Sequence, residues 1–152
     1  MSLHIALFEP EIPQNTGTIL RLAACLNVTV DLIEPLGFLF DDKKLKRSGM
    51  DYIEHVTYKR HESFKAFSEC YKDRRIILID TKGPSSFLDF AFEKGDILLL
   101  GKESTGVPDS LSAQLKDQIH IPMVRQLRSL NVAIAGAMVV TEALRQLKEF
   151  PC

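Results

Sequence analysis

The sequence predicts an α/β protein built around a mostly parallel sheet of about six strands, with helices on both faces. Short aliphatic segments alternate along the chain with segments in which apolar residues recur at helical spacing. A length of 152 residues, 45% of them hydrophobic, suits one globular domain covering residues 1–152. No apolar run reaches the roughly 20 residues that span a bilayer, and the N-terminus lacks a basic region and a cleavage site, so we expect a cytoplasmic protein.

The N-terminal part of the chain predicts a βαβ unit. Residues 3–8 form an apolar run that suits a buried strand and is closed by two prolines. Apolar residues then recur at helical spacing, which predicts a helix beginning near Thr16 or Gly17 with Asn15 or Thr16 as its N-cap. Residues 28–33 are the next predicted strand, and the intervening helix makes the two strands parallel.

The rest of the chain continues this alternation. The predicted helices cover residues 41–48, 63–71 and 108–115, and the predicted strands cover residues 53–58, 75–80, 96–100 and a segment ending at 122. A last helix, from Val132 to Val140, is apolar around nearly its whole circumference, so we expect it to be buried by its own domain or by a second subunit. Ser129 and Asn131 at its entrance are either simple caps or part of a polar ligand site.

Several common functional classes lack their motifs here. The three cysteines form no Cys-x-x-Cys pair and the four histidines show no metal-ligand spacing, so we expect neither a disulfide framework nor a metal site. Gly106 is followed by Val107 and Pro108, where a phosphate-binding P-loop needs lysine and a hydroxyl. The first strand is not followed by the dinucleotide-binding glycine motif, and no Gly-x-Ser-x-Gly elbow marks a hydrolase.

Three loops in the C-terminal half follow predicted strands, at residues 81–84, 101–108 and 122–130. Ligands of open α/β sheets bind beyond the carboxyl ends of the strands. Gly101 and Gly106 suit either a loop that wraps a flat ligand or an ordinary tight turn. The net charge of −1 argues against a uniformly basic coat. Two basic clusters are either solvated faces or, if they border a site, phosphate contacts: Lys43, Lys44, Lys46 and Arg47, and then Arg125 and Arg128.

Three stretches taken together resemble the motifs of the SPOUT RNA 2′-O-methyltransferases. They are residues 10–21 (Pro-Glu-Ile-Pro-Gln-Asn-Thr-Gly-Thr-Ile-Leu-Arg), residues 99–108 (Leu-Leu-Gly-Lys-Glu-Ser-Thr-Gly-Val-Pro), and residues 121–131, which begin Ile-Pro-Met-Val and end Arg-Ser-Leu-Asn. The small single-domain subgroup that acts on the wobble nucleotide of tRNA is the most similar, and residues 8–10, 34–38 and 49–52 also resemble it. The resemblance implies a C-terminal trefoil knot, S-adenosyl-L-methionine as cofactor, no metal, a homodimer, and the tRNA anticodon stem-loop as substrate.

The resemblance also implies roles for individual residues. The cofactor pocket would use Ile79, Thr81, Gly101, Glu103, Ile121, Met123, Ser129 and Leu130. Apolar side chains suit adenine, and the Glu103 carboxylate suits a sulfonium cation. The catalytic positions would be Asn15, Arg21, Ser129 and Asn131. The basic residues Lys43, Lys44, Lys46, Arg47, Arg125 and Arg128 would bind RNA phosphates, so their contribution would fade as salt rises.

Arg21 matches the arginine that the family places beside the ribose 2′-hydroxyl. A guanidinium has a pKa above about 12 and only donates hydrogen bonds, so a role as general base is physically awkward. We expect Arg21 to bind the hydroxyl and an adjacent phosphate, with the phosphate oxygen sharing the proton. Two other functions stay open: the same transfer at another tRNA or ribosomal RNA position, and a non-catalytic RNA- or nucleotide-binding module.

Overall fold

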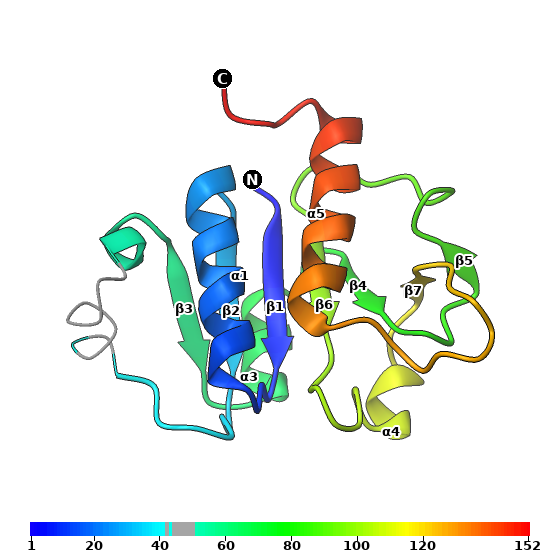
Figure 1. Cartoon of the computed structure of the whole chain (residues 1–152), viewed down its shortest axis with the longest axis horizontal. Coiled ribbons are helices and arrows are strands. Elements are labelled where there is room, and N and C mark those ends of the chain that lie inside the picture. The colour runs from blue at the N-terminus through cyan, green and yellow to red at the C-terminus, as the bar shows by residue number, and fades with distance from the viewer. Residues whose placement is uncertain (42, 44–50) are drawn as a thin grey trace.

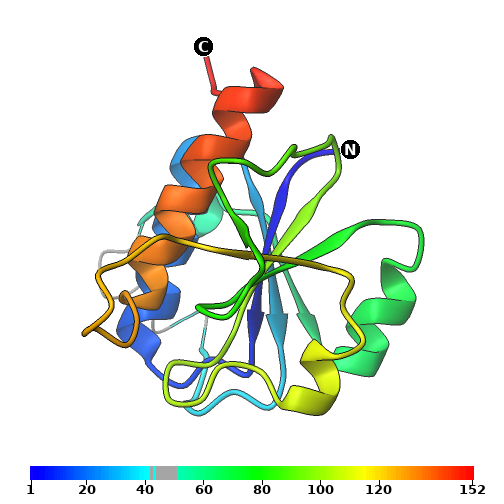
Figure 2. The same cartoon turned by 90° about the vertical axis from the view of Figure 1, so that its right-hand side faces the viewer.

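The computed structural model describes residues 1–41, 43 and 51–152, and seven strands within them form one sheet with helices on both faces (Figure 1, Figure 2). The strands are β1 (His4–Phe8), β2 (Thr29–Ile33), β3 (Tyr58–His61), β4 (Ile76–Ile79), β5 (Ser85–Ser86), β6 (Ile97–Leu100) and β7 (Asp117–His120). The helices are α1 (Pro13–Leu26), the 3-10 helix η1 (Asp51–Glu54), α3 (Phe64–Cys70), α4 (Asp109–Ser112) and α5 (Val132–Leu147).

The order of the strands is β3-β2-β1-β6-β4-β7-β5, and every pair of neighbours is parallel. The central strands β1 and β6 are buried along their whole length. Helices α1 and α5 cover one face, and α3 and α4 cover the other (Figure 2). Alternate residues of β1 serve the two faces: Ile5 and Leu7 belong to the larger apolar cluster with α1 and α5, whereas Ala6 and Phe8 pack in the cluster that contains Phe67 of α3.

The start of α1 differs from the prediction. The helix begins at Pro13, and Ile12 occupies the N-cap position without any side-chain capping bond, so the prediction of Asn15 or Thr16 as cap is wrong. Proline at the first helical position loses nothing, because the N–H that it lacks has no partner inside the helix anyway. As a result Asn15 lies within the first turn of α1, where its side chain is available for a tertiary contact.

The strand predicted at residues 53–58 is also wrong over most of its length. Residues 51–54 form η1, and β3 starts only at Tyr58. Ile53 and Val56 are both buried, and their spacing of three suits a turn of 3-10 helix as well as it suits an irregular strand. The predicted helix at 41–48 falls almost wholly outside the described residues. Strand β5 was not predicted, because two serines carry no hydrophobic period.

Helix α5 has two different faces. Residues on one face pack on the sheet, namely Ala133, Gly136, Val139, Val140, Ala143 and Leu144. On the other face Ile134 is 55% exposed and Met138 is 38% exposed. The chain's own core therefore covers only one side of the apolar helix that the sequence predicts. None of the helices in the described part of the chain combines the length and hydropathy that a bilayer crossing requires.

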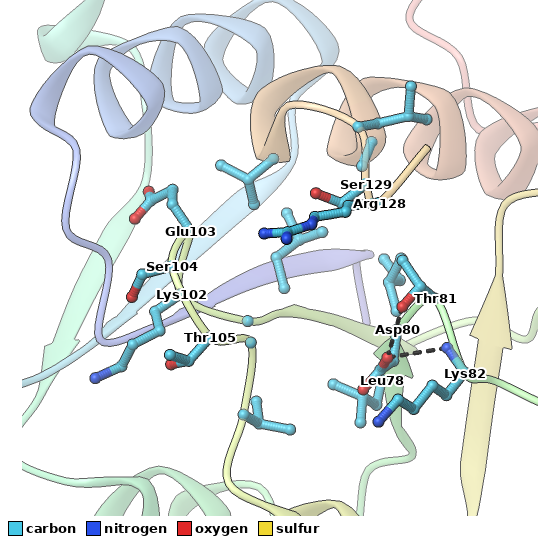
Figure 3. A pocket seen from close by; sticks show the side chains of 18 of the residues that line it. Leu78, Asp80, Thr81, Lys82, Lys102, Glu103, Ser104, Thr105, Arg128 and Ser129 are labelled. Atoms are coloured by element: carbon cyan, nitrogen blue, oxygen red, sulfur yellow. Dashed lines mark hydrogen bonds between the residues drawn. The ribbon is translucent and has the colours of Figure 1, made fainter. Parts of the chain in front are cut away.

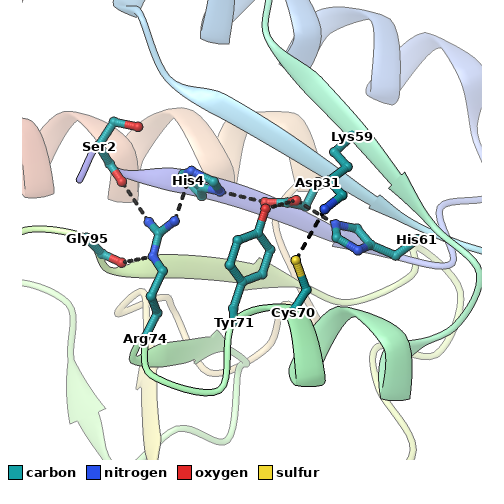
Figure 4. Close-up of polar contacts among 9 residues, drawn as sticks. All are labelled: Ser2, His4, Asp31, Lys59, His61, Cys70, Tyr71, Arg74 and Gly95. Carbon is teal, nitrogen blue, oxygen red and sulfur yellow. Dashed lines mark hydrogen bonds and ion pairs between the residues drawn. The ribbon is translucent and has the colours of Figure 1, made fainter.

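A buried polar network lies between the sheet and α3 (Figure 4). The fully buried carboxylate of Asp31 accepts hydrogen bonds from His4 Nδ1 (2.7 Å), His61 Nε2 (2.7 Å) and the Tyr71 hydroxyl (2.8 Å). Arg74 donates to Nε2 of His4 (3.1 Å), so this imidazole connects Asp31 on one side with Arg74 on the other. The negative charge of Asp31 is thus linked through His4 to a guanidinium.

The same contacts set the ionisation of Asp31. Burial raises the pKa of this carboxyl, but the hydrogen bonds from His4, His61 and Tyr71 together outweigh burial, so its pKa lies below the ordinary value of 3.8. Burial and the bond to Asp31 raise the pKa of the Tyr71 phenol, which therefore stays protonated and continues to donate.

We predict that Asp31→Asn lowers the free energy of unfolding at pH 7 by about 3 kcal/mol, because an amide cannot accept all three buried hydrogen bonds. The lowered pKa makes the carboxylate's contribution fully present above the unfolded-state pKa, and this contribution is lost as pH falls through the folded-state pKa. Urea unfolding at pH 7 and pH 3 should therefore show a large difference between variant and wild type that shrinks at the lower pH. The exposed Asp73→Asn is the control, and an unchanged stability of Asp31→Asn at pH 7 would contradict the prediction.

Candidate functional site

A cavity of about 540 Å³ lies at the carboxyl ends of β4, β6 and β7, where the three predicted loops converge (Figure 3). Every residue that the sequence suggested for the cofactor lines it: Ile79, Thr81, Gly101, Glu103, Ile121, Met123, Ser129 and Leu130. Asn15 and Asn131 line the same cavity, as does Arg128. Segments separated by more than a hundred residues in the chain therefore meet at one site.

The middle loop, residues 101–107, curls tightly against the cavity. The backbones of Lys102 and Gly106 exchange two hydrogen bonds, with N–O distances of 2.8 and 3.3 Å. A Cβ atom on Gly101 would lie 2.6 Å from the Cα atom of Gly106, and Gly106 itself has a φ of +70°. Glycine is therefore required at 101 for close approach and favoured at 106 for its backbone conformation, which leaves backbone groups at the cavity wall.

The side chain of Asn131 joins the two helices that border the cavity. Its Oδ1 accepts the N–H groups of Ala133 (2.9 Å) and Ile134 (3.3 Å), which caps α5. Its Nδ2 donates to Oδ1 of Asn15 in the first turn of α1 (3.0 Å). Asn131 is thus both a cap and part of the polar site, whereas Ser129 lies in the exposed loop before the helix and takes no part in the cap.

Carboxylates latch the middle loop onto the segment between β1 and α1. Glu103 Oε2 accepts the backbone N–H of Glu11 (2.7 Å), and Glu11 Oε1 accepts both the N–H (2.9 Å) and the hydroxyl (2.6 Å) of Ser104. The bond from the Ser104 hydroxyl is the main reason why the pKa of Glu11 is lowered. Lys102 pairs with Glu9, at 3.2 Å between Nζ and Oε1. These contacts hold Glu103 at the cavity wall.

Asp80 shapes the loop that follows β4. Its Oδ1 accepts the backbone N–H of Lys82 at 3.0 Å and lies 3.4 Å from the Thr81 hydroxyl, as drawn in Figure 3. Its own N–H donates to the carbonyl of Ile119 in β7 (2.9 Å). The position of Thr81 at the cavity is therefore set by an Asp-centred turn and by the neighbouring strand.

The cavity suits a ligand with a flat apolar part and a positive charge. Apolar side chains form part of its wall, among them Leu78, Ile79, Leu100, Ile121 and Leu130. Glu103 and Asp80 contribute acidic groups, and the middle loop offers backbone polar groups beside them. This combination fits the adenosine and sulfonium portions of S-adenosyl-L-methionine. Within the described residues no cluster of His, Cys, Asp and Glu side chains could hold a metal ion.

Arg21 does not line the cavity. Six residues of helix put it roughly 9 Å beyond Asn15 along α1, and it is exposed, with its guanidinium carbon 5.9 Å from the ring centre of Tyr52. The family resemblance places Arg21 beside the substrate hydroxyl and not among the cofactor residues, and that role stays a prediction. Among the basic residues, Arg128 lines the cavity, whereas Lys43 and Arg125 are exposed and do not. Lys44, Lys46 and Arg47 lie outside the described residues.

The sequence reasoning missed the residues that latch the loops together, namely Glu9, Glu11, Lys102 and Ser104. Each of them sits inside a stretch that resembles a family motif or its flank, but a single charged or hydroxyl residue gives no sign of its partner. The reciprocal contact of Glu11 with the loop at 103–104 joins positions about ninety residues apart, which no local pattern predicts.

The chain is similar to known proteins over almost its whole length. The model of the SpoU rRNA Methylase family matches residues 2–141. A tRNA (cytidine(34)-2′-O)-methyltransferase from Beijerinckia indica subsp. indica is 48% identical over 145 residues, which cover 94% of this chain and 91% of that protein. A solved structure described as giving insights into 2-OH methylation of C/U34 on tRNA is 43% identical, covers 97% of both chains, and has a TM-score of 0.90.

A more distant structure shares the fold. The SpoU methyltransferase AviRb from Streptomyces viridochromogenes, solved in complex with AdoMet, has a TM-score of 0.83 over 99% of this chain and 59% of its own. Its identity of 24% makes this a likeness of fold alone. The family match over nearly the whole chain carries more weight, and on that match the chain belongs to the SpoU rRNA methylase family.

Proposed function

We propose that the chain is an S-adenosyl-L-methionine-dependent methyltransferase that modifies the ribose 2′-hydroxyl of the wobble nucleotide, cytidine or uridine 34, in tRNA. The observation that carries the proposal is the meeting of Asn15, Glu103, Ser129 and Asn131 at one cavity. The relative at 48% identity, a tRNA (cytidine(34)-2′-O)-methyltransferase, and the solved structure at 43% identity that concerns methylation of C/U34 support the choice of tRNA and of position 34. Because tRNA is found in the cytoplasm, the proposed location of the protein is the cytoplasm.

The cofactor would occupy the cavity between the three loops. When bound, S-adenosyl-L-methionine supplies an electrophilic methyl group. Ile79, Ile121, Met123 and Leu130 would pack on its adenine, and the backbone around Gly101 would offer it polar groups. The carboxylate of Glu103, held by the N–H of Glu11, would favour its positive charge.

Catalysis would then consist mainly of positioning. The substrate oxygen must approach the methyl carbon in line. Holding the two atoms in that geometry lowers the activation barrier, and this is the main contribution proposed for the protein. Asn15 and Asn131 are joined by a 3.0 Å hydrogen bond and, with Ser129, would orient the ribose. Arg21, outside the cavity, would donate to the hydroxyl and to an adjacent phosphate, whose oxygen shares the proton.

The RNA would lie across the loops and the exposed part of α1. Arg125, Arg128 and Lys43 are exposed cations that suit phosphate contacts, and Lys44, Lys46 and Arg47 are proposed for the same role from the sequence alone. The proposed chain path is a trefoil knot. Its support is topological: β7 lies between β4 and β5, although only residues 80–84 connect those two strands. A Cβ on Gly83 would lie 2.4 Å from the carbonyl carbon of Ile119, so the two segments cross in contact.

The proposed functional unit is a homodimer. Exposed apolar side chains gather on α5 and on the loop before it: Val124, Leu127, Leu130, Ile134 and Met138. A monomeric protein rarely leaves such a group of side chains in water, so a second copy of this chain is the proposed cover.

We predict that the protein transfers labelled methyl groups from S-adenosyl-L-methionine to tRNA from a strain lacking it, and that nuclease mapping finds the label on the wobble ribose. Arg21→Ala should lower the single-turnover rate by about a thousandfold, since it removes the donors that stabilise the reacting oxygen. Arg21→Lys should lower it by about a hundredfold, because a point charge cannot replace the forked guanidinium.

Each departure from these results has its own meaning. Near-normal turnover of Arg21→Lys would contradict the two-point contact of the guanidinium. Transfer to ribosomal RNA instead of tRNA would leave the chemistry and change the substrate. Cofactor binding without transfer to either RNA would favour a non-catalytic binding module.

The close approach of Gly101 to Gly106 in the middle loop can be tested by substitution. Gly101→Ala should weaken binding of S-adenosyl-L-methionine by about tenfold or more in calorimetry, because its Cβ would meet the Gly106 backbone at 2.6 Å and displace the cavity wall. The control is Gly95→Ala, which places a side chain at a positive φ (+85°) but lies before β6, at the end of that strand opposite to the cavity. Equal affinities of the two variants for S-adenosyl-L-methionine would show that the middle loop does not form the cofactor site.

A third prediction concerns assembly. Ile134→Glu should convert a dimer into a monomer in sedimentation velocity at micromolar concentration, because the carboxylate would be buried without a partner at the interface. Leu88→Glu is the matched control, since Leu88 is 59% exposed and lies far from α5 in sequence, on the segment after β5. A wild-type protein that sediments as a stable monomer would contradict the proposed dimer.

A further inference from the structure

Four arginines in the described part of the chain lie over aromatic rings, and three of them have their donors engaged elsewhere. Arg60 faces Phe40 and pairs with Glu34. Arg74 faces Tyr71 and donates to His4 and to the carbonyls of Ser2 and Gly95. Arg75 faces Phe90 and makes two hydrogen bonds to Asp96. In these three cases the ring accompanies a guanidinium that already has a structural partner.

Arg21 is different from the other three. Its guanidinium lies 5.9 Å from the ring centre of Tyr52, and among the described residues it makes no hydrogen bond or ion pair. A guanidinium has five N–H donors, and attraction to the face of a ring uses none of them. The contact with Tyr52 therefore restrains the side chain while it leaves the whole set of donors available to another molecule.

Tyr52 is itself fixed to the turn of α1 that carries Arg21. Its hydroxyl donates to the carbonyl oxygen of Gly17 at 3.2 Å. In an α-helix the carbonyl of residue 17 also accepts the backbone N–H of residue 21. Tyr52 is half-buried, and the short helix η1 that contains it packs on α1. The ring, the carbonyl and the arginine thus belong to one local unit, which the burial of Tyr52 holds in place.

We propose that Tyr52 is a positioning residue that holds the Arg21 guanidinium over its ring with all donors free, ready to bind the reacting hydroxyl and phosphate of the RNA. This inference rests on the proposed function, because it takes Arg21 to contact the substrate. Tyr52 acts only through Arg21, and it lies outside the cavity proposed for the cofactor.

The first test compares two variants at Tyr52. Tyr52→Leu, which removes the ring, should lower kcat for tRNA methylation by about tenfold. The dissociation constant for S-adenosyl-L-methionine should stay unchanged. Tyr52→Phe keeps the ring and should stay within about threefold of wild type. Phe90→Leu is the matched control, because Arg75 keeps its bonds to Asp96 after the ring is lost, and its kcat should not change.

The second test asks whether Tyr52 acts through Arg21. In a double-mutant cycle, Tyr52→Leu should slow wild type but should not slow Arg21→Ala any further in single-turnover assays. A general structural role for Tyr52 would instead slow both backgrounds by the same factor, and that result would overturn the proposal. If Tyr52→Leu does not fold, phenylalanines with increasing ring fluorination at position 52 replace it, because fluorination weakens the attraction to a cation at nearly constant size. The rate should fall stepwise along that series, and a flat series would overturn the proposal.

A measurement without turnover separates this inference from the proposed function. In nuclear magnetic resonance, the Arg21 Nε–Hε group should have a high order parameter in the wild type and in Tyr52→Phe, and a low one in Tyr52→Leu. An order parameter that does not change in Tyr52→Leu would overturn the positioning role even if the enzyme methylates tRNA as proposed. A restrained Arg21 in a protein without transfer to tRNA would support the positioning role and contradict the proposed function alone.

Discussion

The side-chain amide of Asn131 constrains both halves of the site at once. Its oxygen caps the N-terminus of α5, and its nitrogen donates to Asn15 at the beginning of α1. The two helices cover the same face of the sheet and start at the same edge, where the strands β1 and β6 end (Figure 1). Because one planar amide makes all of these bonds, a shift of α1 relative to α5 would break either the cap of α5 or the bond to Asn15. The amide of Asn131 therefore helps to set the shape of the cavity, which both helices border.

The other side of the cavity depends on charge rather than on capping. The middle loop buries Val107 in the core, whereas Ser104 and Thr105 at its tip are exposed, and two carboxylates fasten this tip to the segment before α1. Charge-assisted bonds of this kind are directional, so they fix orientation as well as position. Helix α5 also has two kinds of surface: its apolar residues pack on the core on one face, whereas Ile134 and Met138 remain uncovered on the other. This uncovered apolar face is the surface proposed above for contact with a second copy of the chain.

The distant half of the sheet is held by a different kind of contact. Asp31, His4, His61 and Tyr71 form a fully bonded polar group beneath α3, away from the cavity. A buried carboxylate with three donors is rigid, because any rearrangement strands a charge in an apolar environment. This network fixes β1, β2 and β3 to α3. Strand β1 then runs directly into the segment whose residues Glu9 and Glu11 latch the middle loop.

The α/β class, the alternation of most strands and helices, and the three candidate ligand loops can all be predicted from the sequence, because they follow from hydrophobic period and from turn residues that act locally. Through the family resemblance the sequence also named eleven of the twenty-five described residues that line the cavity, including all of those suggested for the cofactor. The folded chain was needed to show the start of α1, the replacement of a predicted strand by η1, and the short strand β5, because these depend on packing partners and not on local pattern. It also separated Arg21 from the cavity and paired it with Tyr52. Residues about ninety positions apart, such as Glu11 and Ser104, find each other only when parallel strands bring their carboxyl ends to one edge, and no sequence period records that meeting.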